Sequence, residues 1–181
     1  MLYLRPYKKG DAEVILSWCR DEALFRKWTG DRYPSYPITA DDMNHKYFDC
    51  NGDCAETDTF CPLTACDESG IAGHFIMKSV GGSHRILRIS FVIVDDQKRG
   101  RGYGREMIRL ALEFGFRIAG AERVTLGVFE NNKPAYACYQ SLGFRPVPTE
   151  RPRECEVLGE MWNIIELAVN RSDYLPGGCV V

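Results

Sequence analysis

The sequence has no surplus of either charge and no long apolar run. It carries 23 Lys and Arg against 25 Asp and Glu, a net charge of −2 at pH 7. General nucleic-acid-binding proteins usually have a basic surplus, so no nucleic-acid partner is expected. No segment approaches the roughly 18 apolar residues of a membrane span. Charges also interrupt residues 1–22, unlike the apolar core of a signal peptide. These absences predict a cytoplasmic protein without a membrane partner.

The cysteines lack the spacing of a structural zinc site. Four of the eight lie close together, at Cys50, Cys54, Cys61 and Cys66. Three, six and four residues separate them, which matches none of the paired C-x-x-C patterns of zinc proteins. A chain of 181 residues without an export signal also does not need disulfides. We therefore predict no metal and favour buried free thiols, with a metal at this cluster as the alternative.

The first third of the chain predicts short elements around a loop. Residues 2–7 alternate like a strand, and Asp11 is expected to cap a helix. Residues 29–39 contain two prolines and are expected to form a loop. Thr39 begins the pattern of a capping box, which predicts a second helix to about Phe48.

From residue 58 onward the pattern changes to strands. Three apolar stretches joined by glycine turns predict an antiparallel meander that ends near residue 96. A glycine-rich loop, a helix, a strand, a second helix and two more strands follow. Because a strand–loop–helix–strand crossover connects parallel neighbours, one parallel pair is expected.

Residues 97–104 read QKRGRGYG and lie between a buried strand and the first turn of a helix. That turn has unpaired N–H groups and partial positive charge. Glycines at 100, 102 and 104 let these groups approach a ligand closely. Further charge comes from Lys98, Arg99, Arg101 and Arg105. The pattern predicts a pyrophosphate site, and a solvated basic turn is the alternative.

Two common phosphate motifs are absent from this loop. The P-loop pattern needs Lys-Ser or Lys-Thr after its last glycine, and neither occurs here. The dinucleotide pattern G-x-G-x-x-G fails because its sixth position is Arg105 or Met107, depending on the register.

A second motif follows about thirty residues later. The segment NKPAYACYQSLGF matches N-x-x-A-x-x-x-Y-x-x-x-G-F. Together the two runs resemble the GNAT superfamily of acyl-CoA-dependent N-acetyltransferases. The family pattern [QR]-x-x-G-x-[GA] fits Arg99, Gly102 and Gly104, and also fits Gln97, Gly100 and Gly102. The element order from residue 1 to about 170 also agrees.

The resemblance implies an α/β (mixed α+β) single domain over residues 1–170. Its sheet would have six to seven mostly antiparallel strands with a parallel, splayed pair, and helices on both faces. Residues 171–181 are expected to form a loose tail. Homodimers are frequent in the family, so a second copy of the chain is a candidate partner.

The resemblance also implies which residues hold acetyl-CoA. The pantetheine arm would pair with the splayed strand at Phe91, Val92, Ile93 and Val94. The pyrophosphate would lie on the backbone of Arg99, Gly100, Arg101, Gly102, Tyr103 and Gly104. Asn132 would hydrogen-bond the cofactor, although it is also a natural helix N-cap. No metal is implied.

Tyr139 is the predicted catalytic residue. A phenol can protonate the CoA thiolate that leaves when an amine attacks the thioester. The competing interpretation is an ordinary core tyrosine on the inner face of its helix.

The general base is less defined. Some relatives carry a glutamate five residues before the equivalent of Asn132, where this chain has Gly127. Glu130, Asp95 and His74 are candidates, and each has a structural interpretation as well: a solvated turn, neutralisation of the basic loop, and a core histidine. A water chain or a partly neutral amine would also suffice.

Trp28, Asp31 and Tyr33 are the candidates for binding the acceptor, because an acid among aromatics suits a cationic amine. The same aromatics could simply pack the proline-rich loop. The sequence thus predicts direct acetyl transfer to a primary amine, either a small molecule or a peptide N-terminus. The alternatives are an acyl-CoA-binding sensor without turnover and a nucleotide-phosphate binder.

Overall fold

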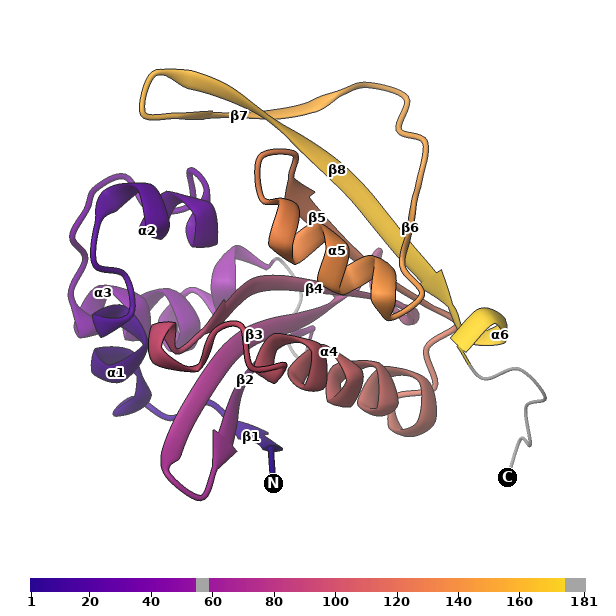
Figure 1. The fold of residues 1–181 in the computed structure, drawn as a ribbon, viewed down its shortest axis with the longest axis horizontal. Helices are drawn as coiled ribbons and strands as arrows, with labels where there is room; N and C mark the ends of the chain where they lie inside the picture. The colour runs from indigo at the N-terminus through magenta and orange to yellow at the C-terminus, as the bar shows by residue number, and fades with distance from the viewer. Residues whose placement is uncertain (55–58, 175–181) are drawn as a thin grey trace.

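The computed structural model describes residues 1–54 and 59–174 (Figure 1). Its strands are β1 (Tyr3–Pro6), β2 (Phe60–Asp67), β3 (Gly70–Val80), β4 (Ser83–Val94), β5 (Arg123–Phe129), β6 (Arg145–Pro146), β7 (Arg153–Val157) and β8 (Glu160–Asn170). Its α-helices are α1 (Asp11–Ser17), α2 (Glu22–Thr29), α3 (Ala40–Asn44), α4 (Tyr103–Glu113), α5 (Lys133–Ser141) and α6 (Arg171–Tyr174). The π-helical turns η1 (His45–Asp49) and η4 (Phe114–Ile118) extend α3 and α4, and the 3-10 turns are η2 (Asn51–Asp53) and η3 (Asp96–Lys98).

One sheet runs through the described chain in the order β1-β2-β3-β4-β5-β8-β6, with β7 also paired to β8. Every pairing is antiparallel except that of β4 with β5. The predicted fold class is confirmed, with one strand more than the six to seven expected. The additional strand is β7, which joins β8 through a turn at Leu158 and Gly159, both with positive φ. Its sequence RECEV has only two apolar side chains and follows a proline-containing stretch. For this reason the sequence pattern did not indicate a strand here.

The parallel pair separates part-way along its length. Pairing runs from Ile86–Arg123 to Ile89–Leu126 and then ends, although both strands continue. At this point β4 contains a bulge, because one residue of β3, Phe75, lies opposite two of β4, Phe91 and Val92. Phe91, inside the bulge, has φ +53°. The bulge turns β4 away from β5, so the predicted splay is present.

The two faces of the sheet carry separate cores. On one face, α4 and α5 pack on a cluster that includes Phe75, Leu126 and Phe144. On the other, α1, α2 and α3 pack against Ile76 and Ile93. Because adjacent strand residues point to opposite faces, this division shows which side each cleft residue faces.

The N-terminal region required two corrections. Helix α2 was not expected, because residues 11–29 contain no glycine or proline to mark the break after α1. Asp11 is not an N-cap: it lies inside α1, buried, and accepts hydrogen bonds from Arg5 and Thr64. The capping box at Thr39 is confirmed.

The predicted tail is partly structured. Arg171–Tyr174 form α6, where the Arg171 amide donates to the Glu122 carbonyl and the Tyr174 ring lies 5.3 Å from that of Phe116. The rest of the expected tail, 175–181, falls outside the described residues. None of the described helices is long and apolar enough to cross a membrane.

Candidate active site

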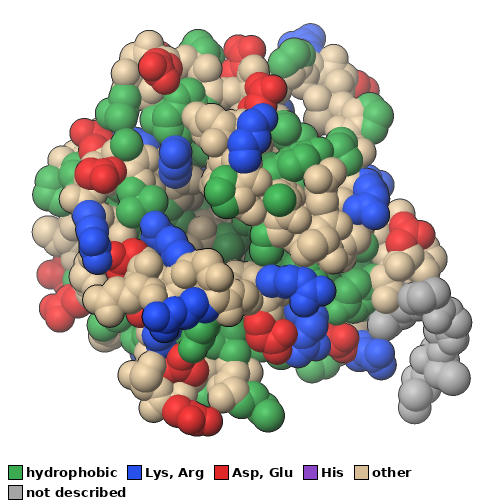
Figure 2. All heavy atoms as spheres, in the orientation of Figure 1, with side chains coloured by type: hydrophobic (Ala, Val, Ile, Leu, Met, Phe, Trp, Pro, Cys, Tyr) green, Lys and Arg blue, Asp and Glu red, His purple; other side chains and the backbone are tan. Residues whose placement is uncertain are grey.

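A cleft of about 320 Å³ opens where β4 and β5 separate. Its lining includes Trp28 and Asp31 from the α2 region, Phe91 and Val92 from the bulge, and Asn132 and Tyr139 from the α5 region. The space-filling view shows a hollow near the middle of this face, with Lys and Arg side chains around it (Figure 2).

The glycine-rich loop leaves the start of α4 open. Gly100 and Gly102 have φ of +74° and +84°, and a Cβ on either would meet no atom within 4 Å. The backbone conformation, rather than lack of space, therefore requires glycine at both positions. Gly102 is the N-cap of α4 and provides no side-chain cap, so the first N–H groups of this helix are open to an anion.

The basic residues of this loop have different tasks. Lys98 pairs with Asp67 at 2.9 Å, and the Tyr103 hydroxyl donates to the same carboxylate at 2.8 Å. Hydrogen bonds from Ser69, Lys98 and Tyr103 lower the pKa of Asp67. The Arg99 Nε donates to the carbonyl of Val94. From the sequence we expected Lys98 to add positive charge at the pyrophosphate site. In the structure its ammonium group instead pairs with Asp67 and fixes the loop.

Arg101 and Arg105 are the loop cations that stay available. Both are exposed, and neither makes an ion pair with another residue in the described part of the chain. They flank the open N-terminus of α4 and can hold phosphate charge there.

The bulged segment of β4 is held from the α2 side. The Trp28 Nε1 donates to the Phe91 carbonyl at 2.7 Å. Phe91 and Val92 line the cleft, whereas Ile93 is buried under α1–α3 and Val94 packs against the core beneath α4. Of the four residues predicted for pantetheine, the first two therefore face the cleft.

Tyr139 lies on α5 and is only 7% exposed. Its ring packs edge-on against Phe144, with the centroids 6.0 Å apart. Burial raises the pKa of its phenol, which is therefore protonated at neutral pH. The hydroxyl makes no hydrogen bond with the described residues, and the residue lines the cleft. Tyr139 is thus a core residue whose protonated hydroxyl makes no hydrogen bond within the described structure.

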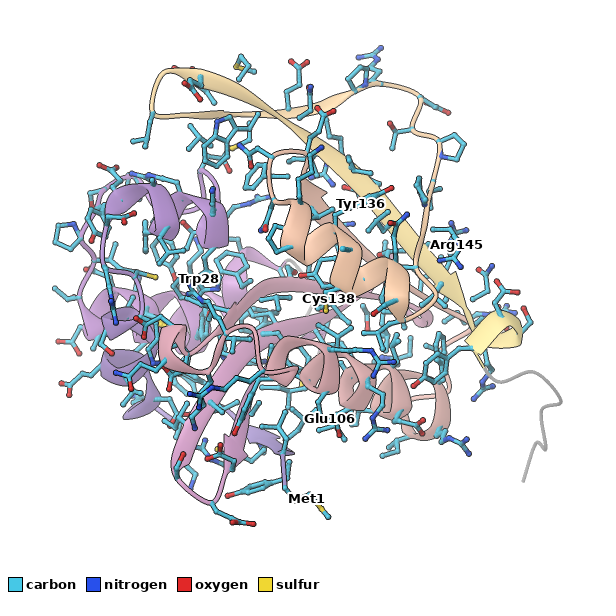
Figure 3. The ribbon with its side chains drawn as sticks, in the orientation of Figure 1. Met1, Trp28, Glu106, Tyr136, Cys138 and Arg145 are labelled. Carbon is cyan, nitrogen blue, oxygen red and sulfur yellow. The ribbon has the colours of Figure 1, made fainter. Side chains whose placement is uncertain are left out.

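The side chains beside Tyr139 on α5 are less suitable. Tyr136 and Cys138 project from opposite sides of the helix (Figure 3). Tyr136 accepts a hydrogen bond from Gln140 and does not line the cleft. Burial raises the pKa of the Cys138 thiol.

Asn132 is the N-cap of α5, as its sequence position indicated. Its Oδ1 accepts from the Ala135 amide at 3.4 Å, and the residue lines the cleft. Its Nδ2 group has no partner among the described residues, so helix capping and ligand binding are compatible.

None of the three candidate bases lines the cleft in the described structure. His74 is fully buried, its Nε2 lies 2.9 Å from the Tyr47 hydroxyl, and burial lowers its pKa to about 3. Asp95 accepts from the Gln97 amide and caps η3. Glu130 is exposed and accepts from Asn163 at 3.1 Å. These positions give each residue a structural task, and the identity of the general base stays a prediction.

The acceptor candidates divide in the same way. Trp28 and Asp31 line the cleft, whereas Tyr33 does not. The Tyr33 ring is buried against Phe25, with the centroids 5.9 Å apart, and its hydroxyl has no hydrogen-bond partner among the described atoms.

From the sequence we did not identify a group of charged residues that lies beside Gly127. Arg88 of β4 donates to both carboxylate oxygens of Glu166, at 2.7 and 3.0 Å, and Arg153 of β7 contacts the same carboxylate. A Cβ on Gly127 would lie 2.9 Å from the Arg88 Nη2 and from the Ile164 Cγ2. The absent glutamate at 127 thus makes room for an arginine. Polar residues inside otherwise apolar strands were the available signal.

The comparisons with known proteins identify the family. The model of the acetyltransferase (GNAT) domain matches residues 1–145. The chain belongs to the GNAT family. A curated relative, spermidine N(1)-acetyltransferase of Escherichia coli K12, is 24% identical over 172 residues, covering 95% of this chain and 87% of the relative.

Solved structures show the same fold. Spermidine N-acetyltransferase from Vibrio cholerae, in complex with CoA and spermine, has a TM-score of 0.79 at 20% identity, covering 96% of this chain and 97% of the other. A putative phosphinothricin N-acetyltransferase has a TM-score of 0.72 at 20% identity, covering 95% and 99%. The family match and the spermidine N(1)-acetyltransferase relatives show that this GNAT protein is an acetyl-CoA-dependent N-acetyltransferase. No group of three His, Cys, Asp or Glu suited to a metal occurs among its described residues.

Proposed function

We propose that this GNAT protein transfers the acetyl group of acetyl-CoA directly to a primary amine, with Tyr139 as the general acid. The observation that carries the proposal is the single cleft that joins the bulge of β4 to the unpartnered hydroxyl of Tyr139. The open N-terminus of α4, with Gly100 and Gly102, supports binding of the CoA pyrophosphate at the end of β4.

In the proposed reaction the amine nitrogen bonds to the thioester carbonyl carbon, and the carbon–sulfur bond then breaks. The Tyr139 proton passes to the departing sulfur, whose conjugate acid has a pKa of about 8.5. The excess proton on nitrogen leaves through water and restores the phenol. Because burial makes this phenol a weak acid, part of its effect is a hydrogen bond to sulfur as negative charge develops.

The cysteines favour direct transfer over an acyl-enzyme. Cys155 lines the cleft, but burial raises the pKa of its thiol, which keeps it protonated and weakly nucleophilic. A thiol in that state is a poor acyl carrier.

The acceptor is proposed to enter between the α2 region and β7. Gly30 approaches Cys155 across this space: a Cβ on it would lie 3.6 Å from the sulfur. Asp31 is exposed beside that contact and can accept a hydrogen bond from an ammonium group. The spermidine acetyltransferases among the relatives are named for an amine acceptor, which agrees with this class of substrate.

The test measures acetyl-CoA binding by thermal shift and CoA thiol release with a panel of amines. Tyr139→Phe should keep the thermal shift and lower kcat about 100-fold, in line with the loss of a general acid. Tyr136→Phe is the matched control on the same helix and should leave kcat unchanged. Equal kcat for wild type and Tyr139→Phe would contradict the assigned role. A thermal shift without thiol release from any amine would indicate the sensor alternative.

A further inference from the structure

The acceptor-side wall of the cleft carries a group of basic residues. Core residues Ile89, Leu126 and Leu167 point towards α4 and α5. Because strand side chains alternate, Arg88 and Glu166 point to the opposite face. That face is separate from the start of α4, where the CoA pyrophosphate is proposed to lie.

Arg88, Glu166 and Arg153 form an ion-paired cluster, two arginines on one carboxylate. Arg88 makes a bidentate pair with Glu166, and its side chain is 22% exposed while that of Glu166 is 11% exposed. Arg88 and Arg153 both line the cleft, and Glu166 between them does not. The cluster keeps one net positive charge. Its buried carboxylate holds the two guanidinium groups in place, so an entering ligand meets arginines already oriented.

The charges that line the cleft favour an anion. Its basic side chains are Lys27, Arg32, Lys46, Lys78, Arg88 and Arg153, against three acidic ones. Lys46 is neutralised by Asp53 at 2.5 Å, and Arg32 lies 3.7 Å from Asp31. Lys78 is half-buried on β3 and makes no ion pair with another described residue. The positive charge therefore concentrates on the strands, beside the open surface of Gly127.

We propose that the acceptor is an amine that also carries an anionic group, a carboxylate or a phosphoryl group, which binds Arg88 and Arg153 with Lys78 nearby. This inference rests on the proposed acetyl transfer and names its substrate class. The amine end lies towards the splay of β4 and β5, and the anionic end lies towards β7. A polyamine such as spermidine is positively charged at both ends and is repelled by this wall.

Gly127 links this specificity to the departure from the family pattern. Any side chain there would push against the Arg88 guanidinium, because even a Cβ comes within 2.9 Å of it. The glycine therefore permits the position of Arg88 in the cleft.

The experiment compares kcat/KM for matched acceptors through CoA thiol release. The panel contains amino acids, the carboxamide of each, aminoalkylphosphonates and spermidine. The kcat/KM of the best anionic amine should be at least tenfold higher than that of its own neutral carboxamide. Its advantage over spermidine should be larger still. Comparison of carboxylates with phosphonates shows which anion the wall prefers. If the neutral amides or spermidine had a kcat/KM equal to that of every anionic amine, the inference would be overturned. The acetyltransferase function would still stand.

Variants sharpen the result. Arg153→Ala should raise KM for the anionic amine about tenfold and leave the KM for acetyl-CoA unchanged. Its control is Arg151→Ala, an exposed arginine two residues earlier that does not line the cleft. Arg153→Glu should shift preference towards spermidine. If Arg153→Ala raised KM for the anionic amine no more than for its amide, the anion would bind elsewhere. No thiol release with any amine, despite an acetyl-CoA thermal shift, would refute the proposed function and this inference together.

Discussion

At the proposed cofactor site beside the start of α4 the ligand-facing groups are mainly backbone amides, whereas on the acceptor side of the cleft they are side chains. The cofactor side depends on Gly100 and Gly102 at the start of α4. The acceptor side combines Trp28, Arg88 and Arg153 from three separate segments. A backbone site needs a particular local conformation, so a short motif specifies it. A side-chain site can change its chemistry one residue at a time while the fold stays the same.

The largest expected effect comes from breaking the cofactor side alone. Gly102→Val forces a β-branched residue to φ +84°, at a cost of roughly 1–3 kcal/mol, or about 5- to 150-fold in acetyl-CoA affinity. Calorimetric titration measures it. Gly104→Ala is the matched control, because its φ is not positive and its Cβ would meet only the Val94 side chain, at 3.7 Å. Equal losses in both variants would show that glycine conformation is not the cause.

The converse change affects the acceptor side. Gly127→Ala places a Cβ 2.9 Å from Arg88 and Ile164, so the arginine must move; overpacking of this kind costs about 1–3 kcal/mol. We expect a lower melting temperature and a higher KM for the acceptor, with acetyl-CoA affinity unchanged. If acetyl-CoA affinity fell as well, the two sides would not be independent.

A smaller effect is expected from the side chains that hold the cofactor loop. Asp67→Asn removes the ion pair with Lys98 and weakens the bond from Tyr103, which should lower acetyl-CoA affinity roughly 3- to 10-fold. Glu68→Gln is the control, because among the described residues this exposed neighbour pairs with the N-terminal amine alone. An Asp67→Asn variant with wild-type affinity would mean that the glycine backbone fixes the loop unaided.

The smallest expected effect is a difference in acid stability. Burial acts to raise the pKa of Glu166, but hydrogen bonds and charge from Arg88 and Arg153 prevail and lower it. Its stabilisation is therefore complete above the unfolded-state value of about 4 and is lost as pH falls through the lower folded-state pKa. Glu166→Gln should lose about 1 kcal/mol at pH 7, roughly 2–4 °C in Tm, and little near pH 2. Melting curves at both pH values measure this. A constant difference would exclude the carboxylate charge as its source.

Much of the cofactor side was predictable because its signals are local. The glycine loop, the helix after it and the Asn132–Tyr139 spacing lie within short stretches of sequence. The role of Lys98 was not predictable, because its partner Asp67 is 31 residues away and meets it only through the β2–β3 turn. His74 was placed correctly on its strand, but only tertiary packing decided that it lies in the core.

The sequence by itself determined the family, the position of the glycine loop and the order of the elements apart from α2, β7 and α6, since periodicity and glycine placement act through neighbouring residues. Only the tertiary structure decided what faces the acceptor. Arg88, Glu166 and Arg153 are separated by up to 78 residues in the chain. They meet because β4, β5, β8 and β7 lie side by side and because Gly127, between them, has no side chain.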